Sequence, residues 1–113
     1  MLFILFLFRE QAGYAQKDSL SQRIILVGDA GEQKNGVHPE LEFIKKSFSL
    51  DKNTTIIFLG DNVYPQGLPS HYEKNYLEKK QVLDSQINVV SGKAANAYFI
   101  AGNHDWMQGR KDG

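Results

Sequence analysis

The chain has 113 residues, enough for one small domain or for part of a larger one. Acidic and basic residues number 13 each, so the charge balance indicates neither a nucleic-acid partner nor a charged membrane surface. Cysteine is absent, which excludes disulfides and thiolate metal sites.

The N-terminal segment is apolar from Leu2 to Phe8, a run too short for a membrane-spanning helix. Gly13-Tyr14-Ala15 then fits a cleavage site of the small-x-small type. We expect residues 1–15 to be a signal peptide within a leader of residues 1–20, which predicts a secreted or periplasmic protein. Because no Lys or Arg precedes the apolar run, a buried strand, a membrane-anchor remnant or a start upstream of Met1 remain alternatives.

Three short apolar runs each end in a glycine that is followed by a side chain carrying oxygen. They are IILVGD at 24–29, IIFLGD at 56–61 and YFIAGN at 98–103. Each run predicts a buried strand, the third over residues 96–101. Each glycine is expected to let the backbone turn sharply and approach a neighbouring group closely.

Two helices are predicted between these strands. The first begins at Pro39 and places apolar side chains inward at helical spacing. The second begins with a capping box, Ser70-x-x-Glu73, and ends at Ser91-Gly92. The expected apolar positions are Leu41, Ile44 and Phe48 in the first helix and Tyr72, Tyr76, Leu83, Ile87 and Val90 in the second.

The alternation of strands and helices predicts an α/β fold with a parallel sheet. If the three strands are neighbours, Asp29, Asp61 and Asn103 all emerge at one edge of that sheet. Open α/β sheets bind ligands at this edge, beyond the carboxyl ends of the strands. Two carboxylates and an amide there, followed by His104 and Asp105, indicate a site for hard metal ions.

These motifs resemble the first three signature blocks of the calcineurin-like metallophosphoesterases, and most closely those of the purple acid phosphatase branch. That branch has Asp-x-Gly, then Gly-Asp-x-x-Tyr, then Gly-Asn-His-Asp/Glu. The resemblance covers residues 23–107 with the blocks in the family's order. It implies that residues 21–113 are the N-terminal part of an α/β/β/α sandwich. The matching segments are Gly28-Asp29-Ala30-Gly31, Gly60-Asp61-Asn62-Val63-Tyr64 and Gly102-Asn103-His104-Asp105.

The resemblance also implies a centre of two metal ions, Fe3+ with a divalent Fe, Zn or Mn. Asp29 would bind the first ion, Asp61 would bridge both, and Asn103 would bind the second. Tyr64 would be the phenolate ligand that colours the family's proteins. A phenol has a pKa of about 10 in water, so it ligates well only beside a strong Lewis acid such as ferric iron.

The same resemblance implies phosphomonoester hydrolysis, with Asn103 and His104 at the substrate. His104 would hydrogen-bond the phosphate and assist departure of the leaving oxygen. Asp105 would support catalysis by orienting either the imidazole or the loop. By contrast, His38 and His71 are expected to be solvated side chains outside the site. Arg110 and Lys111 are expected to be solvated as well.

Two later family blocks, Val-x-x-His and Gly-His-x-His, do not occur in this sequence. We therefore expect a missing C-terminal half of the domain to supply the nitrogen ligands and a second sheet. On this interpretation, the chain alone binds metal weakly and has little or no turnover.

Three alternatives remain open at this stage. A phosphodiesterase or nuclease of the same superfamily usually has Asp-x-His in its first block, whereas this chain has Asp29-Ala30-Gly31 and no basic stripe. A phosphate-accepting receiver domain would not explain Asn103-His104-Asp105. A degenerate, non-catalytic binding module would also lack the later histidines.

Overall fold

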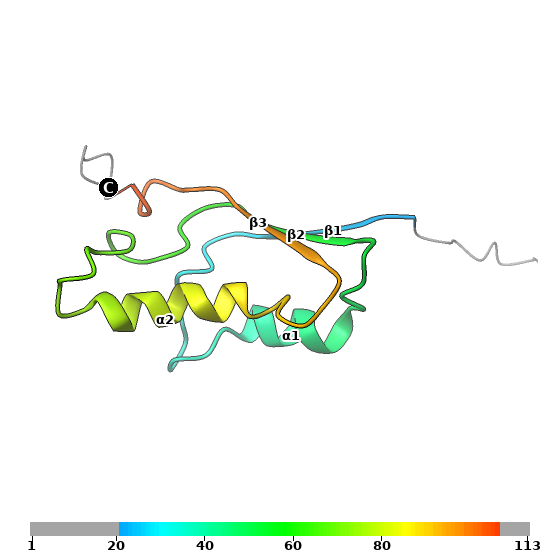
Figure 1. Cartoon of the computed structure of the whole chain (residues 1–113), viewed down its shortest axis with the longest axis horizontal. Helices are drawn as coiled ribbons and strands as arrows, with labels where there is room; N and C mark the ends of the chain where they lie inside the picture. Colours follow the sequence, from blue (N-terminus) through cyan, green and yellow to red (C-terminus); the bar gives the residue numbers. More distant parts are fainter. Residues whose placement is uncertain (1–20, 107–113) are drawn as a thin grey trace, which may run out of the picture.

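The computed structural model describes residues 21–106, which form three strands and two helices (Figure 1). The predicted signal peptide, together with Arg110 and Lys111, lies outside the described residues. No helix among residues 21–106 is long and apolar enough to cross a membrane. The elements in chain order are β1 (Arg23–Val27), α1 (Pro39–Ser47), β2 (Thr54–Phe58), α2 (Tyr76–Ile87) and β3 (Asn96–Phe99).

The three strands form one parallel sheet in the order β1-β2-β3, which confirms the predicted α/β class. Val27 is opposite Phe58 in the register, and Phe58 is opposite Phe99. Because all three strands run in the same direction, the loops that follow them leave from the same edge. This edge is the one at which the predicted site residues were expected to meet.

Both helices cover the same face of the sheet, and the hydrophobic core lies between the two layers (Figure 1). Ile56 and Phe58 of the central strand are fully buried there, and the ring of Phe58 stacks on that of Phe99 at 4.5 Å. In α1, Pro39 occupies the first turn and Leu41 and Ile44 point into the core, as the helical spacing predicts.

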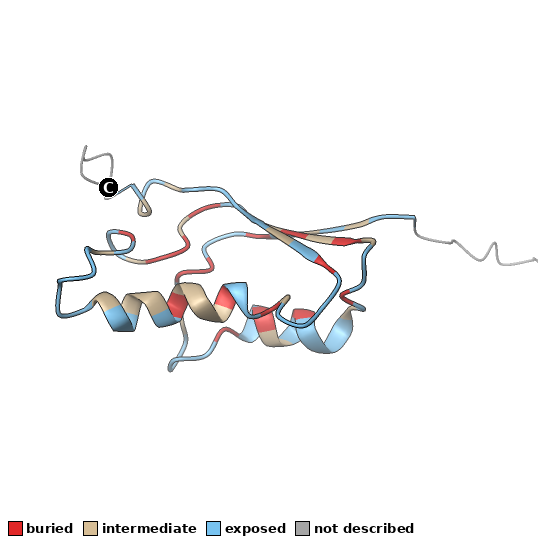
Figure 2. Cartoon of the chain, viewed as in Figure 1, coloured by how far each residue is buried: buried red, intermediate tan, exposed pale blue. Residues whose placement is uncertain are grey.

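Several apolar side chains of the strands are exposed on the face opposite the helices. Figure 2 marks the exposed positions of the strands in pale blue. Ile24, Leu26 and Tyr98 are 65%, 61% and 59% exposed, respectively. Leu26 and Tyr98 flank Ile57 in one row of the register. A continuous apolar row open to water is unusual for a sheet face and typical of an interaction surface.

The second helix differs from its prediction at both its start and its inward face. The amide of Ser70 does bond to the carboxylate of Glu73, at 3.3 Å, but this contact closes a turn, and α2 begins only at Tyr76. Tyr72 is 86% exposed and Ile87 is 46% exposed, so these two positions of the predicted apolar stripe are wrong. Tyr76, Leu83 and Val90 are half-buried, and Val90 packs against the core. The buried positions are Val82, Gln86 and Val89 instead, because this face meets the loops at the end of the sheet.

Two smaller predictions are also corrected. Strand β3 ends at Phe99 and not at residue 101. His38 is only 5% exposed and is therefore not solvated, whereas His71 is exposed as expected. The reason for the burial of His38 is the short antiparallel bridge between Lys34 and Val37, which folds the preceding loop back on itself. The ring Nε2 atom then lies 3.0 Å from Nε2 of Gln33.

Candidate metal centre

Three of the predicted ligand oxygens converge at the carboxyl edge of the sheet. The hydroxyl of Tyr64 donates a hydrogen bond of 2.7 Å to Oδ1 of Asp29 and lies 3.3 Å from Oδ2 of Asp61. Asp29 follows β1, while Asp61 and Tyr64 follow β2. The two loops thus bring two carboxylates and a phenol within hydrogen-bonding distance of one another, as the strand order predicts.

Both aspartates have a backbone conformation that is rare for residues other than glycine. The φ angle is 51° at Asp29 and 53° at Asp61, in the left-handed region. Such residues cost on the order of 1 kcal/mol or more each, and they persist where surrounding contacts hold them. Asn35 is the third non-glycine residue with a positive φ in the described structure, and the other two are predicted ligands directly beyond the strands, which favours a functional role for this edge.

The loop after β3 packs closely against Asp61. The amide of His104 donates a hydrogen bond of 3.0 Å to Oδ1 of Asp61. A Cβ atom at Gly102 would overlap with the amide and carboxylate of Asp61, and one at Gly60 would lie 2.8 Å from the Cα atom of Gly102. Gly60 and Gly102 therefore permit the close approach that the sequence predicts. For Gly28 this expectation is wrong, because its φ is not positive and a Cβ there would meet nothing within 4 Å.

Asn103 and His104 lie on this third loop beside the oxygen cluster. Asn103 is exposed and directly follows Gly102. The Nδ1 atom of His104 lies 2.7 Å from the carbonyl oxygen of Pro65, and its ring centroid is 4.5 Å from that of Tyr64. Because a carbonyl only accepts, Nδ1 carries the proton in this contact, and Nε2 is the atom left for a ligand.

The carboxylate of Asp105 ties the second and third loops together. It accepts hydrogen bonds from the backbone amides of Asn62, Val63 and Gly102, at 2.8 to 3.1 Å. It also accepts one of 2.9 Å from the side-chain amide of Asn62. In the described part of the chain, no hydrogen bond joins Asp105 to the ring of His104, so its contacts position loops.

The sequence model of the calcineurin-like phosphoesterase family matches residues 22–113, which include all the residues of this cluster. The chain belongs to this family. Metal-dependent hydrolysis of phosphoesters is the general activity of this family, whose members typically bind two metal ions. Neither the curated proteins nor the solved structures include a significant match to the chain.

The oxygen cluster of this calcineurin-like phosphoesterase domain could supply part of the coordination shell of a hard metal ion. Carboxylate, amide and phenol oxygens are the donors that hard cations select. Among residues 21–106, no group of three or more His, Cys, Asp or Glu side chains could hold a metal ion. The structure brings together two carboxylates and the phenol of Tyr64, whereas Asn103 lies exposed on the adjacent loop and makes no hydrogen bond to them within residues 21–106.

Electrostatics keep the phenol protonated in the absence of metal. The hydrogen bond to Asp29 raises the pKa of Tyr64 well above its ordinary value, with burial and the charge of Asp61 acting in the same direction. A negatively charged acceptor favours the neutral phenol over a second anion. Ligation by Tyr64 therefore requires a cation strong enough to displace this proton.

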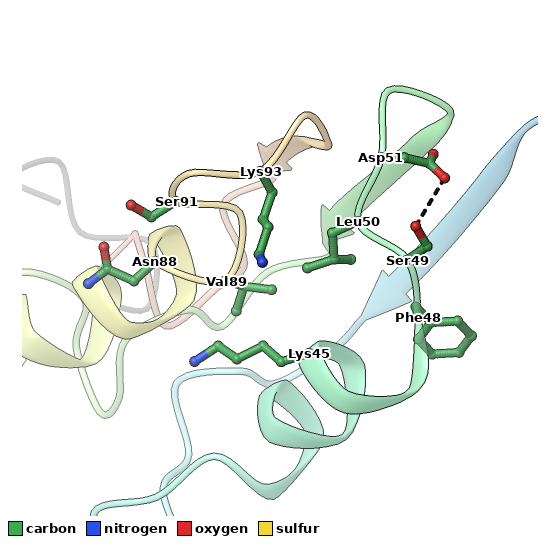
Figure 3. A pocket seen from close by; sticks show the side chains of 9 residues that line it. All are labelled: Lys45, Phe48, Ser49, Leu50, Asp51, Asn88, Val89, Ser91 and Lys93. Atoms are coloured by element: carbon green, nitrogen blue, oxygen red, sulfur yellow. Dashed lines mark hydrogen bonds between the residues drawn. The ribbon is translucent and has the colours of Figure 1, made fainter.

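A separate cavity of 460 Å³ lies at the other end of the phosphoesterase domain (Figure 3). Its lining includes Leu50 and Asp51, which precede β2, and Val89 and Lys93, which precede β3. These segments lie at the amino ends of the strands. The cavity is therefore distinct from the oxygen cluster, which lies at their carboxyl ends.

Sequence reasoning missed two residues that support the cluster, Asn62 and Gln86. Both are buried, and their side-chain amides bond to backbone carbonyls of the loops that carry the candidate ligands. For Gln86 the sequence did contain a signal, because its helical spacing from Val82 and Val89 places this polar side chain on the same face as two apolar ones.

Proposed function

We propose that this domain hydrolyses phosphomonoesters with a dinuclear metal centre of the purple acid phosphatase type. The observation that carries the proposal is the hydroxyl of Tyr64 held between Asp29 and Asp61. A tyrosine that only packed over the loop would have no need of two carboxylate partners. Its position among the oxygens of the cluster supports a role as a phenolate ligand.

In this proposal Asp29 and Tyr64 would hold ferric iron, Asn103 would hold a divalent Fe, Zn or Mn ion, and Asp61 would be a ligand of both. When bound, the ions supply Lewis acidity and offset the charge that develops on the phosphoryl oxygens. Asn103 adds a carbonyl oxygen without a further negative charge, which limits repulsion of an anionic substrate.

His104 is the proposed proton donor and phosphate-binding side chain. Its Nδ1–H bonds to the carbonyl of Pro65, which fixes the orientation of the ring and leaves Nε2 for the substrate. When Nε2 carries a proton, its N–H can be donated to a phosphate oxygen or to the leaving oxygen. Asp105 holds the loop of His104 against the loop of Asp61 through its backbone hydrogen bonds.

The remaining parts of the proposal concern what lies around the described residues. The exposed apolar face of the sheet supports a second sheet that packs on it, as in an α/β/β/α sandwich. Histidine nitrogens from that part of the domain would complete the coordination of both ions. We further propose secretion or export to the periplasm through a signal peptide at residues 1–15.

The test compares the protein expressed from the whole gene with the 113-residue chain. Each is supplied with ferric iron and zinc and assayed with nitrophenyl phosphate and bis(nitrophenyl) phosphate. We expect the whole-gene protein to prefer the monoester and the 113-residue chain to show little turnover. A preference for the diester would contradict the phosphomonoesterase assignment. Absence of hydrolysis of either substrate would indicate a degenerate binding module, and brisk turnover by the chain alone would contradict the shared ligand set.

A further inference from the structure

A buried glutamine lies on the inward face of α2, where the rest of the stripe is apolar. Gln86 has no solvent exposure, while its buried neighbours are Val82 within α2 and Val89 just beyond the end of the helix. Burying an amide is unfavourable unless it finds hydrogen-bond partners. The contacts of Gln86 therefore indicate why a polar side chain occupies a core position.

The two strongest contacts of this side chain reach the two loops that carry the aspartates. Its Nε2 atom donates to the carbonyl oxygen of Asn62 at 2.7 Å and to that of Ala30 at 3.1 Å. Asn62 directly follows Asp61, and Ala30 directly follows Asp29. The Oε1 atom of Gln86 has no partner within the described structure, so the side chain acts there as a donor.

The Nε2 atom of Gln86 thus links the two backbone segments that directly follow Asp29 and Asp61. Within residues 21–106, one direct backbone hydrogen bond between the loops supplements it, from the amide of Gly31 to the carbonyl of Asp61 at 2.9 Å. A Cβ atom at Gly31 would lie 2.7 Å from the backbone of Asp61 and Asn62, so the loops are already in tight contact. Separation of the loops would break the bonds of Gln86 and leave buried carbonyls unpaired.

The link extends to the third loop through Asn62. The side-chain amide of Asn62 donates to the carbonyl of Ile100 at 2.8 Å and to the carboxylate of Asp105 at 2.9 Å. A continuous chain of hydrogen bonds therefore runs from Ala30 through Gln86 and Asn62 to Asp105. It crosses beneath all three loops that follow the strands.

We propose that Gln86 is a positioning residue that fixes the spacing between Asp29 and Asp61 in the metal centre. The inference rests on the proposed function, in which both aspartates are ligands. Left-handed backbone at each aspartate has to be held by its surroundings, and the Gln86 amide supplies that hold one residue further along in each loop. Ligand spacing of this kind is tuned by hydrogen bonds behind the ligands.

The test uses Gln86→Met, which keeps the length of the side chain and removes its donor. Val89→Ala is the matched control, because it removes buried apolar contact near the same helix without touching a loop hydrogen bond. The first measurement is amide exchange at Gly31 in the metal-free chain. We expect several-fold faster exchange at Gly31 in Gln86→Met and wild-type exchange there in Val89→Ala. Equal exchange at Gly31 in Gln86→Met and wild type would overturn the inference.

The second measurement is the Kd for Mn2+, determined by calorimetry at a temperature where every variant is folded. We expect Gln86→Met to raise the Kd by about 10- to 100-fold and Val89→Ala to leave it unchanged. An unchanged Kd in Gln86→Met would overturn the inference. If the protein expressed from the whole gene binds no Mn2+, the proposed function fails. Undetectable binding by the 113-residue chain alone is compatible with that function, and the exchange rate at Gly31 then decides the role of Gln86. If Gln86→Met does not fold, Gln86→Asn, which is too short to span both carbonyls, takes its place with the same criteria.

Discussion

The hydroxyl of Tyr64 lies 2.7 Å from Oδ1 of Asp29, although 35 residues separate them in the chain. The same hydroxyl lies 3.3 Å from Asp61, and the Tyr64 ring lies 4.5 Å from the ring of His104. Tyr64 is therefore the residue at which the loops after β1, β2 and β3 meet. A change at this side chain tests the metal centre more directly than a change at any one loop.

The first prediction concerns Tyr64→Phe. Because the substitution removes the only phenolic oxygen of the cluster, we expect loss of the visible absorption band that ferric iron produces with a phenolate. We also expect the affinity for Fe3+ to fall by about tenfold or more. Absorbance titration with ferric iron measures both effects. Tyr72→Phe is the control, because Tyr72 is 86% exposed, and it should behave as wild type. A band that survives in Tyr64→Phe would exclude Tyr64 as a ligand.

The second prediction concerns the proton of Tyr64 in the metal-free chain. The hydrogen bond to the Asp29 carboxylate is the main reason why the pKa of Tyr64 is raised. Asp29→Asn removes the negative charge, so the phenolate becomes less unfavourable and the pKa of Tyr64 should fall toward its ordinary value of about 10. Ultraviolet difference titration against Tyr64→Phe isolates this group. Asp51→Asn, at an aspartate before β2, should leave the titration unchanged. An unaltered titration in Asp29→Asn would show that this hydrogen bond is absent in solution.

The third prediction compares two glycines that occupy equivalent places in the sequence pattern. A Cβ at Gly102 would overlap with Asp61, whereas one at Gly28 would meet nothing within 4 Å. We expect Gly102→Ala to lower the free energy of unfolding by about 1–3 kcal/mol and to weaken metal binding, because Asp61 has to shift. Gly28→Ala should be close to neutral. Thermal unfolding and Mn2+ titration of both variants measure this contrast. Similar behaviour of the two variants would refute the close approach at Gly102.

The arrangement of the strands could be predicted because it follows from local sequence. Each apolar run is long enough for one buried strand, and the intervening helices require parallel neighbours. From that order alone, Asp29 and Asp61 had to emerge at the same edge, and their carboxylates do lie within reach of Tyr64. The left-handed backbone at both aspartates was not foreseeable, because it depends on contacts between loops.

The errors arose where tertiary contacts decide the outcome. Half of the predicted capping box forms locally, from the amide of Ser70 to the carboxylate of Glu73, yet the chain turns again before α2 begins at Tyr76. Gln86 of this helix then contacts the loops beyond β1 and β2, which hydropathy cannot indicate because the partners are backbone carbonyls. His38 was expected in solvent, and only the bridge between Lys34 and Val37 explains its burial.

The fourth prediction concerns Asp105→Asn. An asparagine replaces one acceptor oxygen with an NH2 group, so the amide of either Val63, which bonds to Oδ1, or Gly102, which bonds to Oδ2, would lose its acceptor. We expect the free energy of unfolding to fall by about 2 kcal/mol, as measured by urea denaturation. Asp84→Asn is the control, because Asp84 pairs only with Lys80 on the surface of α2, and its effect should be clearly smaller. Equal effects in the two variants would contradict the loop-binding role of Asp105.

The fifth prediction concerns the pH dependence of stability. Burial lowers the pKa of His38 below its ordinary value of 6.5, so the folded chain binds fewer protons at this site than the unfolded chain does. Stability then rises with pH between the two pKa values and is lost as the pH falls below about 6.5. His38→Gln stays neutral throughout and should flatten this part of the profile. His71→Gln, at an exposed histidine, should retain the wild-type slope. Urea denaturation between about pH 5.5 and 7.5 measures the slopes, and an identical slope in His38→Gln and wild type would show that burial of His38 does not govern stability in this range.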